Sequence, residues 1–89
     1  MNYTYNTIGT CSARIDFEVR ENPLPDGTTR RTLHNVIFYG GCNGNLQGIS
    51  RLVEGMEIDA VLEKLEGISC NGGPTSCPDQ LCQALRKIQ

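Results

Sequence analysis

The sequence predicts an α+β fold, in which a small antiparallel β-sheet of two or three strands is followed by three helices. Residues 11–20 alternate strictly between apolar and polar side chains, which is typical of a half-buried strand. The second half of the chain carries three short segments with apolar residues at helical spacing. Strands followed by helices favour this class over an all-α or all-β fold.

The bulk properties indicate one small domain, spanning residues 1–89. A hydrophobic content of 38% and the lack of a long apolar run argue against a membrane span. A net charge of −2 without a basic stripe argues against nucleic acid as the main partner. The first ten residues lack the features of a secretory signal, so we expect a cytoplasmic protein.

Two strands are expected to form a hairpin. On the first strand the apolar positions are Cys11, Ala13, Ile15, Phe17 and Val19. Residues 21–29, with two prolines and Asp26-Gly27, predict the turn. The second strand, about 31–39, is apolar on both faces, which predicts a more central place in the sheet. A weaker alternation around Tyr3 and Tyr5 indicates a short additional strand.

Three helices are expected after this hairpin. The first would begin after Asn45 as N-cap and end at Gly55, with Gly48 allowing a close backbone contact. The second covers Ile58 to Leu65 and ends before Gly67. Pro78 opens the third in its first turn, with Ser76 or Cys77 as N-cap and with an apolar stripe of Leu81, Ala84, Leu85 and Ile88.

Five cysteines are the main chemical feature of the chain. A hairpin turn near residue 25 would set Cys11 opposite residues 39–42, so that Cys11 and Cys42 share one end of the hairpin. Cys42 and Cys77 each precede a helix start, where the amides and the helix dipole favour thiolate. With Cys70 in the preceding loop, four sulfurs would be enough for a tetrahedral zinc site.

The residues alone leave three interpretations of these cysteines open: metal ligation, burial as reduced thiols, and redox chemistry. The chain lacks a CxxC pair, the spacing most typical of a zinc site. Cys82 lies next to the apolar stripe of the third helix and is interpreted as a packing residue. The one histidine, His34, lies on a predicted strand and is interpreted as a packed or surface residue rather than as a ligand.

The run Thr75-Ser76-Cys77-Pro78-Asp79 resembles the signature of the TSCPD domain family. The segments Gly9–Ser12, Gly40–Ile49 and Leu52–Met56 are also similar to that family, so the resemblance covers essentially the whole chain. It is nearest to small stand-alone bacterial TSCPD proteins. The same domain occurs at the C-terminal ends of some ribonucleotide reductases, where a metal-binding role is suspected.

The resemblance implies that Cys11, Cys42, Cys70 and Cys77 form the functional set and that Cys82 lies outside it. It implies a non-catalytic accessory module that binds a metal, zinc before an iron–sulfur cluster, and a protein partner such as a ribonucleotide reductase. Any enzymatic activity would be associated with ribonucleoside-diphosphate reduction. The chain is too short to hold a reductase barrel, so catalysis by this chain alone is not expected.

A fainter similarity links the chain to iron–sulfur scaffold proteins, and it implies three helices packed on one face of the antiparallel sheet. Cys42 and Cys77 match their cysteines, whereas Cys70 falls later than the middle one. Two alternative functions stay open at this point. One is a thiol redox protein that delivers electrons to a reductase-like partner. The other is a structural domain with buried reduced cysteines that forms a homodimer through an exposed edge strand.

Overall fold

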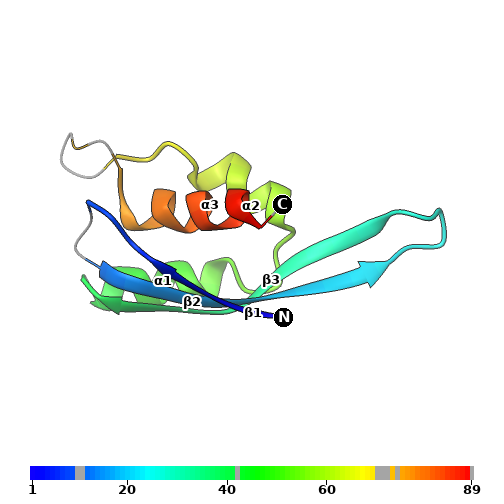
Figure 1. The fold of residues 1–89 in the computed structure, drawn as a ribbon, viewed down its shortest axis with the longest axis horizontal. Helices are drawn as coiled ribbons and strands as arrows, with labels where there is room; N and C mark the ends of the chain where they lie inside the picture. Colours follow the sequence, from blue (N-terminus) through cyan, green and yellow to red (C-terminus); the bar gives the residue numbers. More distant parts are fainter. Residues whose placement is uncertain (10–11, 42, 70–72, 74, 89) are drawn as a thin grey trace.

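The structure is a computed structural model and describes residues 1–9, 12–41, 43–69, 73 and 75–88. Within these residues, the three-stranded antiparallel sheet and the three helices confirm the predicted α+β fold (Figure 1). Along the chain the elements are β1 (Asn2–Asn6), β2 (Ser12–Pro23), β3 (Thr29–Gly40), α1 (Asn43–Leu52), α2 (Ile58–Leu65) and α3 (Cys77–Lys87).

The strand order is β1-β2-β3, so β2 is the central strand of the sheet. The prediction that the strand at 31–39 is the more central one is therefore wrong. Its outward-facing apolar residues Ile37 and Tyr39 stay 49% and 39% exposed. The guanidinium of Arg14 lies 4.1 Å from the centre of the Tyr39 ring, so this ring packs against an arginine rather than a second layer.

The hairpin is longer than predicted, because β2 continues to Pro23 and β3 begins at Thr29, and the two residues pair. The turn predicted over residues 21–29 is therefore too long, and Pro23 lies within the ladder. Since alternate residues of a strand bond to opposite neighbours, its nitrogen faces away from β3 and no ladder donor is lost. Gly27 has a φ of 90°, as expected for the glycine of the Asp-Gly turn.

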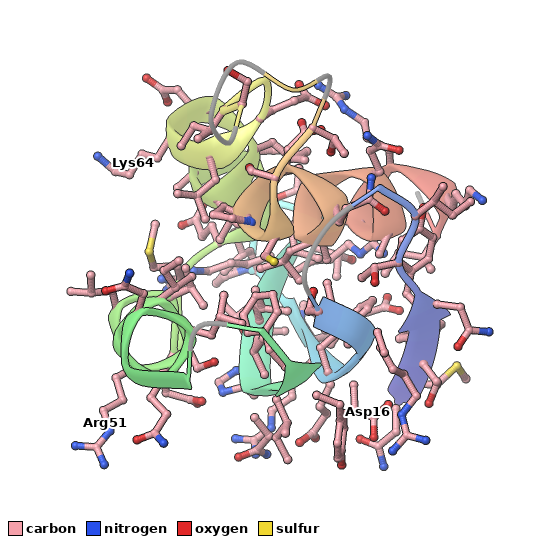
Figure 2. The ribbon with its side chains drawn as sticks, turned by 90° about the vertical axis from the view of Figure 1, so that its left-hand side faces the viewer. Asp16, Arg51 and Lys64 are labelled. Atoms are coloured by element: carbon pink, nitrogen blue, oxygen red, sulfur yellow. The ribbon has the colours of Figure 1, made fainter. Side chains whose placement is uncertain are left out.

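Of the three helices expected on one face of the sheet, α2 and α3 lie there, whereas α1 lies beside β3, level with the sheet (Figures 1 and 2). The hydrophobic core fills the space between the sheet and these helices. It contains Ile15, Phe17, Val19, Leu33, Val36, Val53, Ile58, Val61, Leu62, Leu81, Cys82, Ala84 and Leu85. Cys82 is fully buried, which confirms its interpretation as a packing residue.

The helix boundaries agree with the sequence at α2 and α3 but not at α1. Helix α1 begins at Asn43, so Asn45 lies inside its first turn and is not the N-cap. The close backbone contact expected at Gly48 is absent, since a Cβ built there meets no described atom within 4 Å. Gly55 has a φ of 78°, and its N–H donates to the carbonyl of Leu33, which holds the chain after α1 against β3.

The start of β2 departs from the predicted alternation. Ser12 is buried and Ala13 is exposed, the reverse of the predicted apolar face. A register shift between Ser12 and Arg14 causes this, because one extra residue turns the following side chains to the other face. As a result, the hydroxyl of Ser12 faces α3, whereas the methyl group of Ala13 is exposed.

Candidate functional site

Helix α3 begins in a capped turn that carries Cys77. The hydroxyl of Ser76 accepts a hydrogen bond of 3.1 Å from the backbone N–H of Asp79, which identifies Ser76 as the N-cap. Pro78 occupies the first turn, where a missing N–H costs nothing. Cys77 therefore sits at the first helical position, close to the positive end of the helix dipole, and is 6% exposed.

Ser12 contacts the sulfur of Cys77. Its hydroxyl donates to Sγ at 3.1 Å, and both residues are buried. Ser12 follows Cys11 in the sequence and pairs with Gly40, two residues before Cys42. The start of β2, the end of β3 and the start of α3 therefore meet at one end of the domain.

Asp79 connects this turn to the end of α2. Its carboxylate accepts hydrogen bonds from the Thr75 hydroxyl at 2.6 Å, the Gly67 N–H at 2.8 Å and the Gln83 amide at 2.9 Å. Burial would raise the pKa of Asp79, but these three hydrogen bonds outweigh it and hold the pKa below its ordinary value. Asp79 therefore does more than complement the helix dipole, because it fastens the end of α2 to the start of α3.

Gln80 connects the same turn to the segment that follows β1. Its side-chain oxygen accepts a hydrogen bond of 3.0 Å from the Ile8 N–H, and its amide donates to the Thr75 hydroxyl at 3.0 Å. A Cβ built on Gly9, whose φ is 76°, would lie 3.4 Å from the Thr75 methyl group. These contacts hold the segment before β2 against the start of α3.

Of the four cysteines expected to form the site, Cys77 is described, whereas Cys11, Cys42 and Cys70 lie outside the described residues. Among the described residues, no group of three or more His, Cys, Asp or Glu side chains is placed to hold a metal ion. From the sequence, Ser12 and Thr75 were noted only as members of family motifs, and Gln80 was not singled out. The sequence feature that could have identified them is their position, since each is a polar residue close to Cys11 or Cys77.

Three comparisons with known proteins bear on identity. The model of the TSCPD domain matches residues 2–89. The chain belongs to the TSCPD domain family. No curated protein and no solved structure matches the chain.

The five residues at 75–79, whose one-letter codes give the TSCPD domain its name, have different roles at the start of α3. Thr75 and Asp79 are joined by a hydrogen bond, Ser76 caps the helix, and Pro78 begins it. Cys77 is the one member whose polar atom is directed at β2. The other four residues thus fix the backbone that presents the sulfur.

Cys82 differs from Cys77 although both lie on α3 of the TSCPD domain. Burial, with smaller contributions from Glu66 and Asp79, raises the pKa of Cys82 to about 12. Its Sγ lies 3.8 Å from the carbonyl oxygen of Val61. At neutral pH this residue is a neutral, packed thiol, unsuited to ligation or nucleophilic attack.

His34 forms a second polar cluster, on β3. Its Nδ1 lies 2.7 Å from a carboxylate oxygen of Glu54, and its Nε2 lies 2.8 Å from the Thr32 hydroxyl. Hydrogen bonds from the Asn35 N–H and from His34 hold the pKa of Glu54 below its ordinary value. Thr32 is buried, so its hydroxyl is not accessible to a substrate. The hydrogen bonds of Glu54 to His34 and Asn35 attach the chain after α1 to β3.

A groove of about 550 Å³ runs between β3 and α1. Its lining includes the apolar residues Ile37, Phe38 and Leu46 and the charged residues Arg51 and Glu54. Within the described residues, none of the helices has the length and hydrophobicity needed to cross a bilayer.

Proposed function

We propose that this TSCPD domain is a non-catalytic metal-binding module, with zinc held by the thiolates of Cys11, Cys42, Cys70 and Cys77. The observation that carries the proposal is the hydrogen bond from Ser12 to the sulfur of Cys77. It joins the residue after Cys11 to the start of α3, 65 positions away.

The surroundings of Cys77 fit a thiolate ligand. The helix dipole and the hydroxyl donor both stabilise negative charge on sulfur, the form that binds zinc. Ligand atoms of metal sites regularly accept such hydrogen bonds from neighbouring residues, which orient them. Four thiolates would supply the closed tetrahedral set of a structural zinc site, which has no open position for catalysis.

The described neighbours of the other three cysteines support the same set. Ser12 pairs with Gly40, and Gly40 precedes Cys42 by two residues. The N–H of Gly67, three residues before Cys70, donates to Asp79, two residues after Cys77. Since a chain advances at most about 3.6 Å per residue, these described neighbours are compatible with four cysteines sharing one metal ion.

The partner in this proposal is another protein, with a ribonucleotide reductase as the candidate that the family resemblance implies. The hairpin of β2 and β3 extends beyond the helices and supplies an exposed arm, residues 21–30, for such a contact (Figure 1). Leu24 lies at the tip of this arm and is 42% exposed. A metal site at the opposite end would keep the sheet and α3 together without taking part in that contact.

The test is metal analysis of protein purified without chelators, alongside the variants Cys77→Ser and Cys82→Ala. We expect nearly one equivalent of zinc in the parent and in Cys82→Ala, and a loss of most of it in Cys77→Ser. Cys82→Ala is the matched control, because it removes a buried sulfur from the same helix outside the proposed set. Less than about a tenth of an equivalent of zinc or iron in the parent protein would overturn the proposal.

The same preparation discriminates against the redox alternative. A thiol redox protein would contain little metal and would form a disulfide that involves Cys77 and is reversibly reduced. Mass spectrometry of the protein before and after reduction measures that disulfide. If this disulfide forms in parent protein that contains no metal, Cys77 takes part in electron transfer and is not a metal ligand.

A further inference from the structure

The outer edge of β1 is a row of backbone groups that no described residue pairs with. Strand β1 pairs with β2 alone and is the outermost strand of the sheet (Figure 2). Met1 and Val19 exchange two backbone hydrogen bonds of 2.9 Å, and Thr7 donates to Ala13. Because bonding alternates along an antiparallel strand, the odd-numbered residues of β1 bond to β2 and the even-numbered ones face outward.

Apart from its short length, this edge carries no protection against pairing. Proteins guard exposed edges with charged residues, prolines or bulges, and β1 reads Asn-Tyr-Thr-Tyr-Asn with none of them. Its pairing with β2 runs through five consecutive residues without a register shift. Tyrosine and threonine, which favour strands, occupy its three central positions.

We propose that a second copy of this chain pairs with β1, strand against antiparallel strand, about a two-fold axis at Thr4. In this register Thr4 faces Thr4 of the second copy, and Asn2 faces its Asn6. All three outward-facing residues of β1 then fall in hydrogen-bonded pairs. If the second copy were shifted by one residue, outward-facing residues would lie opposite residues that bond to β2, and these pairs would be lost. The two sheets become one antiparallel sheet, with the same strand used on both sides as an isologous dimer requires.

The side chains of β1 are complementary to themselves in this register. The Tyr3 ring stacks on Phe17 of β2, with centroids 5.4 Å apart. The two-fold axis sets Tyr3 of one copy directly opposite Tyr5 of the other, so the aromatic row continues across the interface. On the opposite face, the exposed amides of Asn2 and Asn6 come together, and each amide can both donate and accept.

The nearby charges do not oppose this pairing. Asp16, which accepts a hydrogen bond of 2.9 Å from Thr4, lies on the face away from α2 and α3 (Figure 2). It also pairs with Arg14 at 3.3 Å. Three strand spacings, about 14 Å, separate the two copies of Asp16, which exceeds the screening length at physiological salt. On the face covered by α2 and α3, the ammonium group of Lys87 lies 5.2 Å from the centre of the Tyr5 ring. Its positive charge is opposite in sign to that of Asp16.

The interface is small, since β1 contributes five residues on each side. Such an area is typical of weak, concentration-dependent association rather than of an obligate dimer. The proposal does not involve the cysteines and is independent of metal binding.

The first test is sedimentation velocity from micromolar to millimolar concentration, with Thr4→Lys and the control Asn22→Lys. Thr4→Lys places two like charges on the axis, whereas Asn22→Lys adds the same charge to an exposed position of β2 on the projecting hairpin. We expect the parent and Asn22→Lys to dimerise as concentration rises and Thr4→Lys to stay monomeric. A monomeric parent at millimolar concentration, or a dimer that survives Thr4→Lys with its circular dichroism unchanged, would overturn the proposal.

The second test needs no substitution. Amide hydrogen exchange, measured by NMR on the parent protein, should slow at least several-fold at Asn2, Thr4 and Asn6 between the lowest and highest concentrations. The amides of Tyr3 and Tyr5 already bond to β2 and should change little. Protection that grows instead along β3, at Val36 and Phe38, would place the interface at the other edge of the sheet and contradict the proposal.

Discussion

The hydroxyl of Ser12 donates a hydrogen bond of 3.1 Å to the sulfur of Cys77, although 65 positions separate the two residues. This contact connects the start of the central strand to the start of the last helix. It is a direct link between the region of the first cysteine and the signature turn of the family.

Replacing Ser12 with alanine tests this link. We expect Ser12→Ala to weaken zinc binding by about 10- to 100-fold, because a donor that orients and stabilises the Cys77 thiolate is lost. Competition against a chromophoric zinc chelator measures the affinity. Ser50→Ala is the control, since that hydroxyl donates to the Leu46 carbonyl within α1, far along the chain from the signature turn. An unchanged affinity would show that Ser12 plays no part in the site.

The Asp79 carboxylate should be a main determinant of stability. Asp79→Asn places an amide NH₂ against groups that now donate to the carboxylate, so at least one buried donor loses its acceptor. We expect a loss of about 1–3 kcal/mol in the free energy of unfolding, measured by urea denaturation. Asp59→Asn, at an exposed position in the first turn of α2, should cost less than about 1 kcal/mol. Equal effects of the two substitutions would contradict this assignment.

The same carboxylate should contribute to acid sensitivity. The pKa of Asp79 is lower in the folded protein than the ordinary value of about 3.9 that it takes on unfolding. The unfolded chain therefore binds the proton more tightly, and protonation favours unfolding. The contribution of Asp79 to stability is complete above about pH 4 and is lost as pH falls through the folded pKa. Unfolding free energy plotted against pH should fall less steeply below pH 4 in Asp79→Asn than in the parent, and parallel curves would refute this.

Cys82 should resist alkylation in the folded protein. Burial raises its pKa to about 12, and the side chain has no exposed surface. Mass spectrometry after iodoacetamide treatment at pH 8 should show Cys82 modified in denaturant and unmodified without it. Cys82→Ala supplies the control, because it should lower the number of labels in denaturant by one and leave the native number unchanged. Native labelling of Cys82 at the rate of the denatured chain would contradict the buried placement.

The sequence was informative wherever a pattern is local. The alternation around Ile15 and Phe17, the helical spacing from Ile58 to Leu65 and the Ser76 cap each depend on residues within one or two turns. Those elements form as predicted because side-chain periodicity and capping act over that range. The packing role of Cys82 also follows from its place beside the apolar stripe of α3.

The errors arose where partners distant in sequence decide the outcome. The place of β3 at the sheet edge depends on β1 pairing with the far side of β2, and the burial of Ser12 depends on a register shift. Neither leaves a periodic signal. The three hydrogen bonds of Asp79 come from different parts of the chain, so its local position at a helix start accounted for only part of its role.

By itself, the sequence determined the α+β class, the amphipathic faces of the strands and helices, and the family to which the chain belongs. The tertiary structure alone decided that β2 is central, that β1 presents an unprotected edge, and that a serine hydroxyl lies against the sulfur of Cys77. The physical reason is range. Periodicity and capping are set by neighbours along the chain, whereas strand order, register shifts and buried polar contacts are set by which distant segments can pack together with their polar groups satisfied.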